Sequence, residues 1–226
     1  PTVSVLCACV LVRPTDWQLL WVRSIGFYGM VLLPVSLSVL ASLVWRVEHQ
    51  GSNGLVLMSI PVPTWRTVAA KATAAWLLAA VMQLVLVMAA TAVGSLVLGL
   101  PGVLPSRYLV AGLLIAVACA PVCAVQSGLA AFTRSFAVPV ATGLALTGAG
   151  TTALLVHIPA AWLLPHALVT RTTQIGATSD GAALVFAAQD LNWTSAAVTV
   201  GISAALSAVV VLATSVALER SDTRGG

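Results

Sequence analysis

The chain has 226 residues, of which 60% are hydrophobic and only 7% are charged. Soluble domains carry roughly 25% charged residues, so this composition excludes an ordinary soluble protein and indicates an integral membrane protein. The net charge is +4, but the basic residues lie between apolar runs and form no cluster that could hold a nucleic-acid backbone. We therefore attribute the charge to membrane orientation and to anionic lipid headgroups, and we expect no nucleic-acid partner.

The apolar runs have the length of membrane-spanning helices. A run of about 20 apolar residues crosses the hydrocarbon core as an α-helix, and the alternation expected of transmembrane strands is absent. The sequence predicts an all-α fold, a polytopic membrane helix bundle that forms a single transmembrane domain over residues 1–226. The expected spans are 1–12 (partial), 25–45, 72–93, 109–132, 136–156 and 196–218.

The first apolar run is too short to cross a bilayer. We interpret it as the outer end of a first membrane helix whose earlier half is absent from this sequence. A signal-peptide remnant is the rival interpretation, but the run has no basic region before it and no small-residue cleavage pattern. The sequence therefore predicts five complete spans and one truncated first span.

Two spans contain residues that shape helix packing. Pro34 in the 25–45 span is expected to kink that helix. In the 109–132 span, small residues recur at every fourth position and form a ridge that lets another helix backbone approach closely. The ridge residues are Gly112, Ala116, Ala120, Ala124 and Gly128.

The predicted spans contain few strongly polar side chains. Gln83 and Gln126 are candidates for a polar transport pathway, although hydrogen bonding between helices is the favoured role for both. No Asp, Glu, Lys or Arg lies near the middle of a predicted span, so a proton- or ion-coupled carrier would lack its usual intramembrane carboxylate. This pattern favours an externally powered transporter of an amphipathic or apolar substrate.

Two longer segments separate the spans. The loop 46–71 has breaks at 51–54 and 61–63, which leave Leu55 to Ile60 as a short apolar helix. The segment 157–194 is expected outside the cell, with an amphiphilic piece, Ala160 to Val169, lying on the membrane surface. Placing the loop 46–71 in the cytoplasm follows the bias of basic residues. It puts inside Arg46, Arg66, Lys71, Arg134, Arg220 and Arg224, and outside Arg13, Arg23, Arg107 and Arg171.

The loop has a pattern found in a known family. It contains an acid, a Gly-Ser turn, a short leucine-containing helix, a proline, an arginine and a lysine that opens a long apolar helix. This pattern resembles the cytoplasmic loop of ABC-2 type permeases, especially the small permeases of lantibiotic-immunity exporters. The matching positions are Glu48, Gly51-Ser52, Leu55 to Leu57, Pro61, Arg66 and Lys71. Leu55 stands where the family often has an aromatic residue, which is a departure from the pattern.

The resemblance implies a six-helix, ABCG-like permease whose first helix is truncated here. It implies an ATP-driven exporter of an amphipathic or hydrophobic substrate, such as an antimicrobial peptide or a drug, serving immunity or resistance. The chain itself would bind no cofactor, and ATP and Mg would be bound by separate ABC ATPase subunits. A second permease subunit, identical or related, and the lipid bilayer complete the expected partners. The expected location is a bacterial plasma membrane. The coupling-loop candidates are Glu48, Leu55, Leu57, Ile60, Pro61, Arg66 and Lys71.

The sequence contains no catalytic motif of its own. A P-loop needs Gly-x-x-x-x-Gly-Lys-Ser/Thr, and the lone lysine, Lys71, stands between two alanines. An intramembrane serine protease built on Ser203 and His157 is disfavoured because Ala205 replaces the second glycine of the hydrolase pattern. The four cysteines are interpreted as reduced packing residues. A secondary carrier and a non-transport polytopic membrane protein remain the alternatives to an exporter permease.

Overall fold

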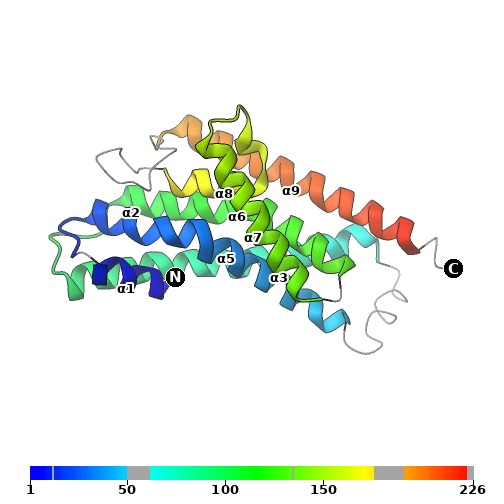
Figure 1. Cartoon of the computed structure of the whole chain (residues 1–226), viewed down its shortest axis with the longest axis horizontal. Helices are drawn as coiled ribbons and strands as arrows, with labels where there is room; N and C mark the ends of the chain where they lie inside the picture. The colour runs from blue at the N-terminus through cyan, green and yellow to red at the C-terminus, as the bar shows by residue number, and fades with distance from the viewer. Residues whose placement is uncertain (12, 50–61, 134, 176–190, 223–226) are drawn as a thin grey trace.

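The chain forms an elongated all-α bundle in the computed structural model, which describes residues 1–11, 13–49, 62–133, 135–175 and 191–222 (Figure 1). The elements are α1 (Thr2–Leu11), α2 (Trp17–Phe27), η1 (Tyr28–Leu32), α3 (Leu33–His49), α5 (Thr64–Ala92), η2 (Val93–Val97), α6 (Ser106–Phe132), α7 (Ala137–Leu155), η3 (Ala161–Leu163), α8 (Pro165–Thr173) and α9 (Trp193–Asp222). The predicted fold class, an all-α membrane bundle, is confirmed.

The described chain contains five helical stretches long and apolar enough to cross a membrane. They are Trp17–Arg46, Thr64–Val97, Ser106–Phe132, Ala137–Leu155 and Trp193–Arg220. Each coincides with one of the long apolar runs in the sequence. α1, at the position of the expected partial span, has ten residues and is too short to cross a bilayer.

The first long helical stretch begins earlier than the sequence analysis places it. Asp16 caps α2, because its carboxylate accepts a hydrogen bond from the Leu19 N–H at 2.7 Å. The helix then continues through Arg23, which stands just before the predicted start of the span at residue 25. A single charged side chain does not interrupt a helix, whereas a capping residue marks where it begins.

The middle of this stretch is distorted where the sequence predicts a kink. η1 is a π-helical turn directly before Pro34. Proline has no backbone N–H, so a carbonyl one turn earlier loses its helical donor, and π-turns and prolines are recognised causes of bending. The distortion places the Tyr28 ring in the core, where it is fully buried.

α6 is the central helix of the bundle. In its most apolar stretch 67% of the residues are buried, against 11% for α9, which runs along the outside (Figure 1). The small-residue ridge of α6 explains how neighbours approach. A Cβ atom on Gly112 would lie 3.0 Å from Val87 of α5, and one on Gly128 would lie 2.7 Å from the Thr214 hydroxyl of α9. The ridge thus admits two different helices at its two ends.

α8 differs from the sequence-based expectation of a helix on the membrane surface. Nearly all its residues are buried, and it packs against α6 and α7. A Cβ atom on Gly150 of α7 would lie 2.9 Å from the Ala167 backbone nitrogen. The threonines of α8 bond to carbonyls of their own helix: Thr172 donates to Leu168 at 2.7 Å and Thr173 to Thr170 at 2.6 Å. These internal bonds satisfy the threonine hydroxyls inside the buried helix.

Candidate functional site

The predicted coupling loop is described only at its two ends. Leu55, Leu57, Ile60 and Pro61 lie outside the described residues. Glu48 lies in the last turn of α3.

Lys71 ties the first part of α5 to the end of α3. Its Nζ donates a hydrogen bond to the Val44 carbonyl at 3.0 Å and lies 5.4 Å from the centroid of the Trp45 ring. The Trp45 indole N–H in turn donates to the Ser127 hydroxyl of α6 at 2.7 Å. We call Lys71, Trp45 and Ser127 the junction. It links α3, α5 and α6 at the base of the loop.

Arg66 occupies a more exposed position than Lys71. It lies in the first turn of α5, with its guanidinium carbon 5.4 Å from the Trp65 ring centroid. Trp65 is itself 47% exposed. This cation–π contact lies on the surface and is of the kind worth about 0.5–1 kcal/mol. The structure therefore gives Lys71 an interhelical contact and leaves Arg66 on the outside of α5.

Gln83 makes a hydrogen bond inside the bundle. Its Nε2 donates to the Tyr28 hydroxyl at 2.9 Å, and both side chains are buried. The bond joins α5 to the π-helical turn η1. The Gln83 Oε1 atom is buried and has no hydrogen-bond partner in the described structure. This glutamine hydrogen-bonds between helices, which is the favoured role in the sequence analysis.

Gln126 meets His166 in the centre of the bundle. Their Nε2 atoms are 3.3 Å apart, Gln126 is fully buried, and His166 is 4% exposed. Burial lowers the pKa of His166 to about 4, so the imidazole is neutral at pH 7. With its proton on Nδ1, the ring accepts the Gln126 amide hydrogen at Nε2. The pair connects α6 to the buried helix α8.

The backbone of α7 packs closely against Gln126 at Gly143. A Cβ atom there would lie 2.8 Å from the Gln126 Nε2 and would collide with the Ser38 hydroxyl of α3. That hydroxyl donates to the Pro34 carbonyl at 2.9 Å. Ser38, Gln126, Gly143 and His166 thus form a polar layer where α3, α6, α7 and α8 meet. The side chains in this layer are neutral, so an apolar or amphipathic molecule would face no buried charge there.

Several residues in these contacts carry no clear signal in the sequence. His166 lies in a segment that the sequence places outside the bundle, so its pairing with Gln126 could not be expected. Tyr28 and Trp45 carried a weak signal, since a tyrosine or tryptophan in an apolar run needs a partner for its polar hydrogen. Nothing in the sequence indicates which partner each one finds.

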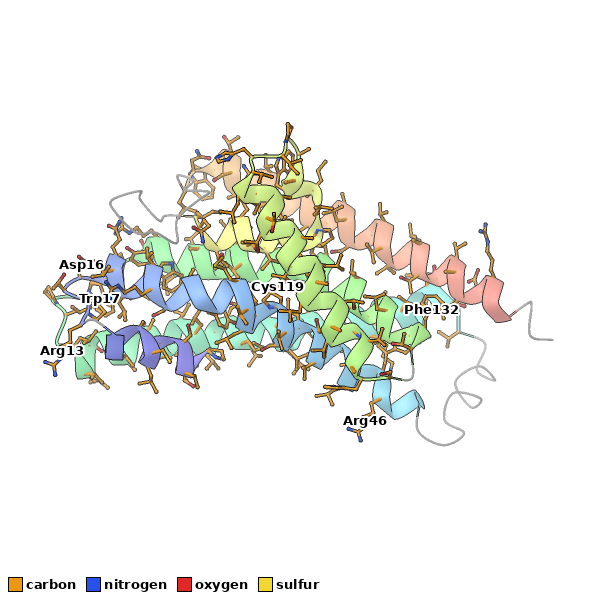
Figure 2. The ribbon with its side chains drawn as sticks, viewed as in Figure 1. Arg13, Asp16, Trp17, Arg46, Cys119 and Phe132 are labelled. Atoms are coloured by element: carbon orange, nitrogen blue, oxygen red, sulfur yellow. The ribbon has the colours of Figure 1, made fainter. Side chains whose placement is uncertain are left out.

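Ser203 and the four cysteines are the remaining side chains with nucleophilic or metal-binding chemistry that the sequence offers. In the described part of the chain, the Ser203 hydroxyl is buried and has no hydrogen-bond partner. All four cysteines are free, and Cys119 lies within the bundle (Figure 2). Within the described ranges, no three side chains of His, Cys, Asp or Glu gather in a way that would hold a metal ion.

Comparison with known proteins identifies the family. Residues 3–150 match the model of the ABC-2 family transporter proteins. The match covers about two thirds of the chain and contains the spans from α2 to most of α7. No curated protein and no solved structure matches the sequence. The chain therefore belongs to the ABC-2 family and is a membrane-embedded permease subunit of an ABC transporter.

Proposed function

We propose that the chain is the permease of an ATP-driven exporter that moves an amphipathic or hydrophobic substrate, such as an antimicrobial peptide or a drug. The proposal rests mainly on the polar layer. The buried polar side chains among the described residues are hydroxyls, glutamines and one neutral histidine. Such groups exchange hydrogen bonds with a peptide or drug without attracting an ion. A carrier driven by an ion gradient would be expected to use a charged side chain in that place, whereas the side chains of this layer are neutral at pH 7.

The proposed exporter belongs to the lantibiotic-immunity type, in a bacterial plasma membrane. The support is the loop pattern, from Glu48 through Pro61 and Arg66 to Lys71, which resembles that subgroup. ABC ATPase subunits would bind ATP and Mg, because no P-loop is found in this sequence. A second permease subunit, identical or related, would complete the transport path.

The loop 46–71 is the proposed contact with the ATPase. Leu55, Leu57 and Ile60 would enter an apolar groove on that subunit, and Pro61 would end the docking helix. The junction supports this assignment, because Lys71 and Trp45 fasten the base of the loop to α3, α5 and α6. Motion received by the loop would thus reach the helices that carry Gln83 and Gln126.

Leu57→Asp tests the coupling contact without changing a membrane span. A carboxylate placed in an apolar contact costs several kcal/mol, so we expect loss of ATPase co-purification and of transport-stimulated ATP hydrolysis. Ser52→Asp, in the turn before the proposed docking helix, is the matched control for added charge. Wild-type association and hydrolysis with Leu57→Asp, at equal membrane expression, would remove the loop from the mechanism.

The substrate class needs its own experiment. Cells expressing the permease with an ABC ATPase that co-purifies with it should tolerate a higher concentration of a lantibiotic peptide than cells in which that ATPase carries a Walker A lysine substitution. Protection that depends on the proton gradient and survives that substitution would favour a secondary carrier. No protection against lantibiotics or hydrophobic drugs would refute the substrate assignment while leaving the coupling test unaffected.

A further inference from the structure

A cavity of about 410 Å³ opens at the end of the bundle where α3 and α6 finish and α7 starts. This volume is in the range of small-molecule sites. Its lining residues are Ser42, Arg46, Ala130, Thr133, Ser135, Phe136 and Pro139. Ser42, Ala130 and Pro139 are buried and form its inner wall, whereas Arg46, Ser135 and Phe136 are exposed and form its rim. We call it the rim cavity.

The rim cavity lies at the level of the membrane boundary. Arg46 is the last residue of one candidate span, Phe132 ends a second, and Ala137 begins a third. Figure 2 shows Arg46 and Phe132 at the end of the bundle opposite Asp16 and Trp17. Lipid headgroups occupy this level, so a ligand that enters from the bilayer presents its polar part to Arg46 and its apolar part to the inner wall.

The hydrogen-bond donors on the rim suit an anion. No hydrogen bond or ion pair engages the Arg46 guanidinium or the Ser135 hydroxyl within the described part of the chain. By contrast, Ser42 and Thr133 donate to the Ser38 and Leu129 carbonyls, both at 2.8 Å. Arg46 and Ser135 are therefore the donors that a ligand would meet, and a guanidinium binds a phosphate oxygen pair in a planar fork.

Two further features of the rim cavity restrict the chemical class of ligand that it can bind. α7 starts beside Ser135 and has no side-chain cap, so its first N–H groups add positive potential at the cavity. None of the described lining residues is acidic, so none of them would pair with the ammonium of a zwitterionic headgroup. Ala130, Phe136 and Pro139 offer apolar contact beside the cation, which a free phosphate ion would not use.

We propose that the rim cavity binds the headgroup of an anionic phospholipid, with Arg46 and Ser135 on the phosphodiester and with Ala130, Phe136 and Pro139 against the adjoining carbon chains. The bound lipid bridges α3, α6 and α7. It therefore stabilises three of the helices that form the polar layer, which lies about one turn further into the bundle.

The test measures lipid-dependent stability of the delipidated full chain in detergent. Binding to the folded state raises the unfolding midpoint, so phosphatidylglycerol should raise it more than phosphatidylcholine. Arg46→Gln should weaken the apparent phosphatidylglycerol affinity about tenfold, as expected for loss of a charge-assisted hydrogen-bond pair. Ser135→Phe, which fills the exposed mouth without altering the core, should abolish the difference between the two lipids.

Arg220→Gln is the matched control, because Arg220 lies in the last turn of α9, outside the lining of the cavity, and carries the same charge. It should retain the wild-type response. Equal responses of Arg46→Gln and wild type would overturn the proposal, as would an equal loss in Arg220→Gln, which would indicate general charge attraction. If millimolar inorganic phosphate alone reproduced the shift, the ligand would be a soluble anion and the lipid assignment would be wrong. If Arg46→Gln fails to fold, Ser135→Phe decides: an undiminished difference between phosphatidylglycerol and phosphatidylcholine in that variant would overturn the proposal.

Discussion

Lys71 and the Val44 carbonyl, 27 positions apart in the sequence, are joined by a hydrogen bond of 3.0 Å that fixes α5 against the end of α3. A lysine near a membrane boundary usually extends its ammonium toward water. This one turns toward a backbone carbonyl and the Trp45 ring, which makes it part of the helix packing. Its contribution should therefore be larger than that of an ordinary surface charge.

Lys71→Met should destabilise the protein and uncouple the loop from the bundle. The variant keeps the apolar stem but loses a charged hydrogen bond and a cation–π contact, together worth about 2–3 kcal/mol. Unfolding can be followed with a thiol-reactive dye once the accessible Cys7 and Cys9 are replaced by serine, because Cys119 and Cys123 are buried and free. Arg66→Met is the control, with an expected cost below about 1 kcal/mol. Equal losses in the two variants would contradict the role assigned to the junction.

The sequence predicts the membrane spans well because their cause is local. Each span is an apolar run of the length a bilayer demands, and the ridge of α6 can be identified from its spacing of four residues. The first boundary was placed at residue 25, where the apolar run begins, whereas the cap at Asp16 decides where the helix begins.

The contacts between elements could not be predicted in the same way. α8 is buried because its threonines bond internally and because Gly150 and Gly143 let α7 come close to α8 and α6. These are relations between residues far apart in the chain. The glutamines could be predicted to hydrogen-bond across helices, but their partners, Tyr28 and His166, could not.

His166 should make stability depend on pH. Its pKa is about 4 in the folded protein, below the ordinary value of 6.5, so the unfolded state binds more protons between these two pH values. Stability is therefore complete above about pH 6.5 and declines as the pH falls toward 4, by roughly 1.4 kcal/mol per pH unit. Unfolding midpoints between pH 7.5 and 5 measure this decline. His166→Gln should flatten it, while the exposed His157→Gln should not. An unchanged slope in His166→Gln would refute the assignment.

Gln83 and Tyr28 should behave as a coupled pair. Tyr28→Phe removes the hydroxyl and leaves the Gln83 amide buried without its acceptor, at a cost of about 1–3 kcal/mol. Gln83→Leu likewise leaves the Tyr28 hydroxyl buried without its hydrogen-bond donor. The double variant should cost less than the sum of the two single changes, because each already breaks the one bond. Additive losses in thermal unfolding would show that the bond contributes nothing.

Gly143→Ala tests the polar layer directly, and α7 supplies its own control. The added methyl group would collide with the Ser38 hydroxyl and lie 2.8 Å from the Gln126 Nε2, so α7 must move away from α3 and α6. Overpacking of this kind costs about 1–3 kcal/mol, and it should also disturb the contact between Gln126 and His166.

Gly148→Ala makes the same chemical change five residues later in the same helix, where nothing lies within 4 Å of the new Cβ. That variant should be neutral or slightly stabilising, because alanine favours a helix over glycine by about 1 kcal/mol. Thermal unfolding and transport-linked ATP hydrolysis of the two variants should therefore diverge. If they were equal in both assays, close packing at Gly143 would not be what closes the polar layer.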